Sequence, residues 1–188
     1  MEVRIYDPEG QLKEEHEADI IAYHREKDLA LLCLKRAEDF PVIAKLASRE
    51  TLKEITVFTP VYAVGCPLGH PPLPSLGEIS NLQKEVDGEK FWMMNAPTFF
   101  GNSGGGIFHR ETHELVGISA MICTYDGFVS VPVPHLGIMV SLLTVYDWLD
   151  SKYLQYVYND AYTPQVCRKL RREASRPHPP RPLPQFRY

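Results

Sequence analysis

The sequence predicts an all-β fold that is followed by one helix and a basic tail. Three observations indicate this. Short segments rich in β-branched and aromatic residues, separated by turn signals, make up the first 134 residues. From His135 to about Tyr158, apolar residues instead recur every three or four positions, which is typical of an amphipathic helix. The last part is rich in Arg and Pro, so we expect a folded domain over residues 1–160 and a disordered tail over residues 161–188.

The expected strands end at recognisable turns, of which Asp87-Gly88 and Asp126-Gly127 are typical of tight hairpins. Many short strands at this spacing are typical of a sandwich or a barrel. The nine expected strands are Val3–Tyr6, Asp19–Tyr23, Leu29–Leu34, Val61–Val64, Leu76–Leu82, Lys90–Asn95, Gly105–His109, Leu115–Ile122 and Phe128–Val133.

The composition is that of an ordinary folded domain, with 44% hydrophobic residues, 23% charged residues and a formal net charge of −4. No apolar run reaches the ~20 residues of a membrane-spanning helix, and the first residues lack the features of a signal peptide. The four cysteines are widely spaced, so we expect buried free thiols, which favours a reducing, intracellular compartment. The seven histidines form no metal-binding motif, and neither a metal nor another cofactor is expected.

The tail carries seven basic residues and one acidic residue, and five of its last thirteen residues are proline. Proline disfavours both helix and sheet, so disorder is expected there. The segment Arg176–Pro182 fits the Arg-x-x-Pro-x-x-Pro pattern of ligands of proline-recognition domains. Since no aromatic residues alternate with its basic ones, the tail argues against a nucleic-acid partner.

One serine lies within the glycine-rich run Gly101–Gly106, which reads Gly-Asn-Ser-Gly-Gly-Gly. Glycine permits backbone torsions that other residues avoid, so such a run can direct its amides toward one point. A serine in that setting presents its oxygen beside N–H groups able to hold an oxyanion, as acyl transfer requires. The run also fits an ordinary turn, in which Gly, Asn and Ser are common. No Gly-Lys-Ser/Thr follows it, which argues against a phosphate-binding loop.

A serine hydroxyl needs an adjacent base, usually a histidine that a carboxylate orients. The candidate carboxylate is Asp28, which begins the apolar segment Asp-Leu-Ala-Leu-Leu. An Asp at the start of a strand can accept a hydrogen bond from an imidazole. It can equally face water, which is the commoner situation.

Taken in order, five segments of the chain resemble a trypsin-like serine peptidase, and most closely the HtrA/Deg branch. The resemblance covers roughly Val3 to Trp148 and implies a chymotrypsin-like double β-barrel, with the active site in the cleft and a helix at the end. The five segments are Asp28–Leu32, Ala63–Gly69, Gly77–Ser80, Gly101–Gly106 and Glu114–Ile118.

The resemblance also implies residue roles. Ser103 would be the nucleophile and Asp28 the orienting carboxylate. The backbone amides of Gly101 and Ser103, with that of Asn102, would form the oxyanion hole. The specificity pocket would be walled by Pro97, Phe128, Val129 and Ser130. Because none of these four is charged, a protein or peptide substrate with a small or medium apolar side chain before the scissile bond is expected.

The chain departs from this pattern in one respect, because the family's histidine is missing. In the HtrA-like pattern that histidine precedes the aspartate by roughly thirty residues, which falls just before Met1. His16 and His24 lack its flanking residues. Three interpretations follow. The chain is a serine endopeptidase whose histidine lies upstream of Met1, which leaves the first barrel N-terminally incomplete. Alternatively it is a catalytically inactive homologue that binds a peptide or a partner, or an adaptor that acts through its tail.

Overall fold

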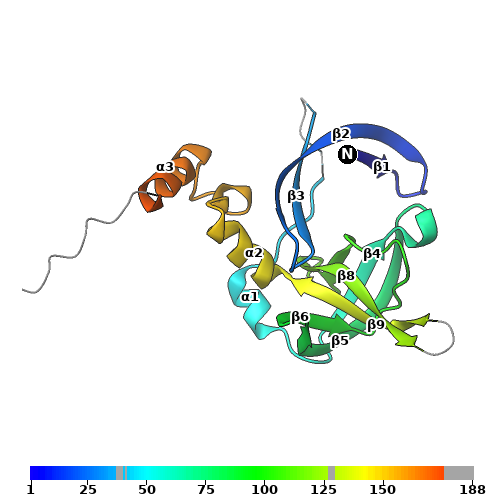
Figure 1. Cartoon of the computed structure of the whole chain (residues 1–188). Coiled ribbons are helices and arrows are strands. Elements are labelled where there is room, and N and C mark those ends of the chain that lie inside the picture. The colour runs from blue at the N-terminus through cyan, green and yellow to red at the C-terminus, as the bar shows by residue number, and fades with distance from the viewer. Residues whose placement is uncertain (37–39, 41, 127–129, 176–188) are drawn as a thin grey trace, which may run out of the picture. The chain divides into compact units, whose positions relative to one another are not determined.

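The computed structural model describes residues 1–36, 40, 42–126 and 130–175 (Figure 1). The chain divides into two compact units, Met1–Val145 and Tyr146–Tyr188, and each is described by itself. The nine strands of the described residues all belong to the first unit, as the alternation and turn signals predict.

A three-stranded antiparallel sheet opens the first unit. It consists of β1 (Glu2–Tyr6), β2 (Leu12–His24) and β3 (Leu29–Leu34), in that order. The chain reverses twice, once where Gly10 N donates to Asp7 O (2.9 Å) and once where Asp28 N donates to Arg25 O (3.1 Å). Figure 1 shows β2 as the long curved ribbon that pairs with both neighbours. Strands β1 and β3 therefore each pair on one side.

A closed six-stranded barrel makes up the rest of the first unit, with the strand order β4-β5-β6-β9-β8-β7. It closes because β4 pairs antiparallel with both β5 and β7. Along β4, half-buried and fully buried residues alternate, so that every second side chain points into the core. The strands are β4 (Pro60–Gly65), β5 (Leu73–Val86), β6 (Glu89–Met94), β7 (Gly106–His109), β8 (Leu115–Asp126) and β9 (Ser130–Ser141).

Two short elements join these strands. Helix α1 (Arg49–Glu54) precedes the barrel and begins at Ser48, whose hydroxyl accepts a hydrogen bond from Thr51 N (3.0 Å). The 3-10 turn η1 (Pro67–Gly69) follows β4. The segment before α1 is tied to the barrel because Leu115 N donates to Lys45 O (2.7 Å) at the start of β8.

The second unit is helical. Helix α2 (Leu142–Ser151) starts in the first unit and continues into the second, where it is followed by η2 (Gln155–Val157) and α3 (Pro164–Ala174). The predicted helix from His135 to about Tyr158 was thus wrong in its first part, because residues 135–141 continue β9. Helix α2 begins only where Ser141 Oγ accepts a hydrogen bond from Thr144 N (3.3 Å).

The tail also differs from expectation in its first part. Residues 164–174, predicted as disordered, form α3, whose cap is Thr163 and whose first residue is Pro164. Proline at this position costs no hydrogen bond, because the first amides of a helix have no partner within it. The tail from residue 176 onward, including the proline-rich segment 176–182, lies outside the described residues.

The four cysteines are all free, but they differ in exposure. Cys167 is buried as predicted, whereas the prediction of a buried thiol is wrong for Cys33, which is exposed on β3. Among the described helices, none combines the length and the apolar character that crossing a membrane requires.

Candidate active site

The serine loop, defined here as residues 95–105, connects β6 to β7 and is held by backbone hydrogen bonds. Asn102 N donates to Phe99 O (3.0 Å) and Gly105 N donates to Asn102 O (2.9 Å), which makes a tight turn around the serine. Two further bonds tie the loop to β8, from Gly104 N to Ser119 O (2.7 Å) and from Ser119 N to Gly105 O (2.9 Å). The loop is therefore a fixed part of the barrel.

Gly101 is a residue of this loop at which a side chain does not fit. Its φ of +98° lies in the region that favours glycine. A Cβ atom at this position would also collide with the backbone of Cys66 and Leu68. The turn η1 packs this closely because Leu68 N donates to Phe100 O (2.7 Å). The segment Ala63–Gly69 thus supports the serine loop through the backbone of Cys66 and Leu68.

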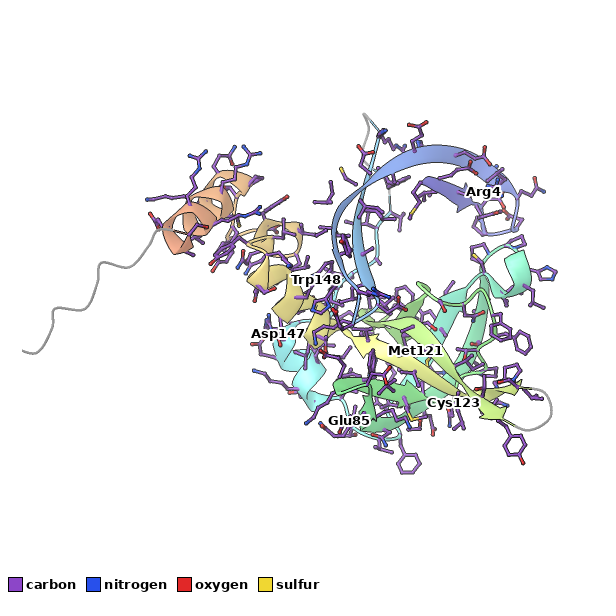
Figure 2. The ribbon with its side chains drawn as sticks, in the orientation of Figure 1. Arg4, Glu85, Met121, Cys123, Asp147 and Trp148 are labelled. Atoms are coloured by element: carbon purple, nitrogen blue, oxygen red, sulfur yellow. The ribbon has the colours of Figure 1, made fainter. Side chains whose placement is uncertain are left out.

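Ser103 is exposed, and its hydroxyl donates a hydrogen bond to Ala120 O on β8 (2.8 Å). Figure 2 labels Met121 and Cys123, which follow Ala120 on this strand. Sequence reasoning did not find Ala120, because a backbone carbonyl leaves no mark in the sequence. The hydroxyl is accessible, but its proton points to a carbonyl rather than to a base.

Two backbone amides beside this hydroxyl are free to bind an oxygen. The N–H groups of Gly101 and Ser103 form no hydrogen bond in the described part of the chain. The amide of Asn102, by contrast, is engaged with Phe99 O. Of the three amides predicted for the oxyanion hole, two are thus available and that of Asn102 is used by the turn.

Asp28 lies on the other sheet, in the turn between β2 and β3. Its φ of +51° is unusual for a residue other than glycine, although Asp tolerates it better than most. The side chain is exposed, and among the described residues its carboxylate has no hydrogen bond or ion pair. The neighbouring Lys27 forms an ion pair with Glu89 at the start of β6, which ties this turn to the barrel. No contact joins Asp28 to Ser103 in the described structure.

A family model for the trypsin-like peptidase domain matches residues 6–118. The chain belongs to the trypsin-like peptidase family. No curated protein matches the sequence.

Solved structures of HtrA-type proteases resemble this member of the peptidase family. One is the HtrA-type protease AlgW with a decapeptide, which is 22% identical, with a TM-score of 0.62 over 73% of this chain and 41% of that chain. Another is a variant of AlgW with a tripeptide, which is 21% identical, with a TM-score of 0.64 over 80% of this chain and 47% of that chain. This chain thus spans less than half the length of either. The likeness confirms the predicted chymotrypsin-like β fold.

Three of the described histidines of this peptidase-family chain have other partners. His135 Nδ1 lies 3.0 Å from Asn95 O at the start of the serine loop, and His24 Nδ1 lies 3.1 Å from Glu26 Oε2. His16 Nε2 lies 2.7 Å from Glu14 Oε2 on the first sheet. Within the described ranges, no histidine forms a hydrogen bond with Ser103. The described residues therefore bring together an exposed serine hydroxyl and two unpartnered amides, without a histidine bonded to that hydroxyl.

A cavity of about 240 Å³ adjoins the serine loop. Pro97, predicted as a wall of the specificity pocket, lines it together with Thr98, Phe99 and Asn102. Ser130, predicted for the same pocket, does not line this cavity, because it pairs with Asp126 at the far end of the β8–β9 hairpin. Phe128 and Val129 lie outside the described residues. Pro134, which sequence reasoning missed, contributes from β9 instead.

Proposed function

We propose that this chain forms the nucleophile-bearing part of a serine endopeptidase, with Ser103 as the nucleophile. The observation that carries the proposal is the exposed Ser103 hydroxyl beside the two unpartnered amides of Gly101 and Ser103, on a loop that is hydrogen-bonded to the barrel. Membership of the trypsin-like peptidase family supports it.

In the proposed reaction Ser103 Oγ attacks the carbonyl carbon of a peptide bond while a base removes its proton. Negative charge develops on the carbonyl oxygen, toward which the amides of Gly101 and Ser103 donate. Removing one such donor typically costs about 10²–10³ in turnover. The amine leaves with a proton from the base, and water then hydrolyses the acyl-enzyme in the same way.

The base in this proposal is a histidine in a segment N-terminal to Met1, oriented by Asp28. Two observations support this. The family's spacing puts a histidine just ahead of Met1, and the Asp28 carboxylate has no other partner in the described chain. Losing the base typically costs about a million-fold in turnover, so the 188 residues alone are expected to be nearly inactive.

The proposed substrate is a protein or peptide chain. The similar proteases were solved with a decapeptide and a tripeptide, which supports this class. A small or medium apolar side chain before the scissile bond is proposed, because the predicted specificity residues, Pro97 among them, are all uncharged.

Labelling with a fluorophosphonate probe tests the proposal, because the probe reacts with activated serines. Protein that includes the residues preceding Met1 is expected to be labelled, and the Ser103→Ala variant is not. Ser80→Ala is the control, since Ser80 is an exposed serine on β5 outside the serine loop. Strong labelling of the 188-residue chain alone would disprove the proposed position of the base.

One observation favours a second function, that of a non-catalytic peptide-binding module. The Ser103 hydroxyl proton is engaged by Ala120 O, as expected of a serine that has no base to activate it. If neither protein is labelled, while an unmodified apolar peptide binds and Gly101→Ala weakens that binding, the second function replaces the first.

A further inference from the structure

Helix α3 buries little of its surface, although it is short. Within the described residues Cys167 is its one buried residue, and the thiol donates to Gln155 Oε1 of η2 (3.5 Å). Isolated helices of fewer than about 12–15 residues are marginal in water, and most helices in proteins are stabilised by an apolar face that packs against another surface. A helix of eleven residues with one buried side chain is therefore incompletely packed in the described chain.

The apolar row of α3, defined here as Val166, Leu170 and Ala174, faces water. These residues are four positions apart, so they lie on one side of the helix. Val166 is 44% exposed and Leu170 is 36% exposed. Removing this row from water would release free energy in proportion to the apolar area that is buried.

Basic residues dominate the remaining surface of α3. They are Arg168, Lys169, Arg171 and Arg172. The three arginines form no ion pair among the described residues, and the one acid of the helix, Glu173, has its Oε1 4.0 Å from Lys169 Nζ. The helix dipole favours cations in the last turn, which accounts for Arg171 and Arg172 but not for the two basic residues before them. Three further arginines and no acidic residue follow α3 in the sequence.

An apolar row beside basic residues fits a phospholipid surface better than it fits other anionic partners. The phosphates of a nucleic acid would pair with the arginines but would leave Val166 and Leu170 in water. A protein groove that takes up a helix uses apolar anchors three, four and seven positions apart. Counted from Val166, these positions are Lys169, Leu170 and Glu173, two of which are charged.

We propose that α3 lies along the surface of an anionic phospholipid membrane. The apolar row enters the boundary between headgroups and acyl chains, as in other interfacial amphipathic helices. Lys169 and Arg171 lie on either side of Leu170, and their long side chains reach the lipid phosphates. The helix is about 10–12 Å across, close to the Debye length of about 8 Å, so the other two arginines are attracted as well. Four or more basic residues on an amphipathic helix are typical of binding to anionic lipids.

Co-sedimentation of the 188-residue chain with lipid vesicles tests this proposal. At about 0.15 M salt, vesicles of phosphatidylcholine with about 30% phosphatidylserine are expected to bind the chain roughly a hundredfold more tightly than pure phosphatidylcholine. The amides of α3 are also expected to exchange more slowly with the mixed vesicles present, because the bilayer supplies the missing packing. Equal binding to both kinds of vesicle, or binding to neither, would overturn the proposal.

Two substitutions separate the charge from the apolar contact. Arg171→Gln is expected to weaken binding to the mixed vesicles roughly fivefold, and Leu170→Gln roughly tenfold. Glutamine is a good helix former, so both variants keep α3. Arg110→Gln and Leu76→Gln are the matched controls, because both side chains are exposed in the first unit, and they are expected to leave binding unchanged.

A short DNA duplex and a polyglutamate peptide decide between a lipid surface and other anionic partners. Both are expected to bind more weakly than the mixed vesicles. Binding of either as tightly as the vesicles, or vesicle binding that Leu170→Gln leaves unchanged, would show that α3 recognises charge alone and would overturn the proposal. None of these measurements involves Ser103, so the failure of this proposal does not imply failure of the proposed function.

Discussion

The closed barrel and the three-stranded sheet are held together by different means. In the barrel every strand has a neighbour on both sides, and core residues such as Ile107 and Met139 are fully buried. In the sheet, the buried apolar side chains of residues 1–36 are Ala18 and Leu29, while Ile20 is 55% exposed. The proposed nucleophile is therefore fixed by a packed core. The proposed orienting carboxylate depends on a turn and on a few contacts with the barrel.

The largest expected effect is on the free energy of unfolding, when one Ile→Ala substitution is made in the barrel and another in the three-stranded sheet. Ile107→Ala in β7 removes a fully buried side chain and is expected to cost about 2–5 kcal/mol of unfolding free energy. Ile20→Ala in β2 is expected to cost less than about 0.5 kcal/mol, because this side chain is already exposed. Urea denaturation measures both values. Similar losses would show that the sheet has a core of its own in solution.

The next largest effect is expected at Gly101. Gly101→Ala combines a positive φ with a collision against the backbone of η1, so it is expected to cost about 2–4 kcal/mol and to abolish probe labelling. Gly88→Ala is the matched control, because its φ is also positive (+82°) but a Cβ there meets open space. The control is expected to cost about 1–2 kcal/mol. Equal losses for the two variants would mean that the serine loop can move away from η1.

The ion pair between Lys27 and Glu89 tests how the Asp28 turn is held. Lys27→Glu or Glu89→Lys alone is expected to speed hydrogen exchange of the Asp28 amide roughly fivefold, as for the loss of about 1 kcal/mol from a half-buried pair. The double charge reversal restores the pair and is expected to return exchange toward the original rate. If the double variant exchanges as fast as the single ones, the pair does not hold the turn.

The smallest effect is a pH dependence at Glu114. The hydrogen bond from Lys45 holds the pKa of this carboxyl below its usual value, aided by Thr112 and opposed by burial. A lowered pKa stabilises the fold above the unfolded value of ~4.3, and this contribution is lost as the pH falls through the folded pKa. Glu114→Gln is expected to remove at most about 1 kcal/mol at pH 7, because Lys45 is exposed.

Thermal melts between pH 7 and pH 3 check this prediction. The difference in stability between the original protein and the Glu114→Gln variant is expected to shrink as the pH falls from the unfolded pKa of ~4.3 through the lower folded pKa of Glu114. A difference that stays constant down to pH 3 would show that the carboxylate contributes nothing through its charge.

Local signals predicted the strands well and the helices less well. Turn residues and alternation locate β3 within its observed bounds, because both signals act over neighbouring residues. The start of α2 was misplaced because the apolar pattern of residues 135–141 fits a strand as well as a helix. The cap at Thr163 and the following Pro164 do signal α3, but the prolines farther along the tail led to a prediction of disorder.

In the candidate site, too, features set by neighbouring residues could be predicted, whereas features set by distant contacts could not. The glycine requirement at position 101 follows from the sequence motif, and the structure supplies its cause in the contact with Cys66. The bond from Ser103 to Ala120 and the cavity beside the serine loop depend on contacts between distant segments. No local pattern encodes such contacts.

The way the barrel closes also sets the order in which the site can assemble. Gly106, directly after the serine loop, pairs with Val64 on β4 and with Ile118 on β8. Ile118 belongs to the local β7–β8 hairpin, but Val64 is distant along the chain, so its pairing with Gly106 carries a larger loop-closure entropy cost and is expected to come later. The amides around Ser103 acquire their positions only when β7 pairs with β4. A folding intermediate with most of its strands in place would still lack the proposed oxyanion donors.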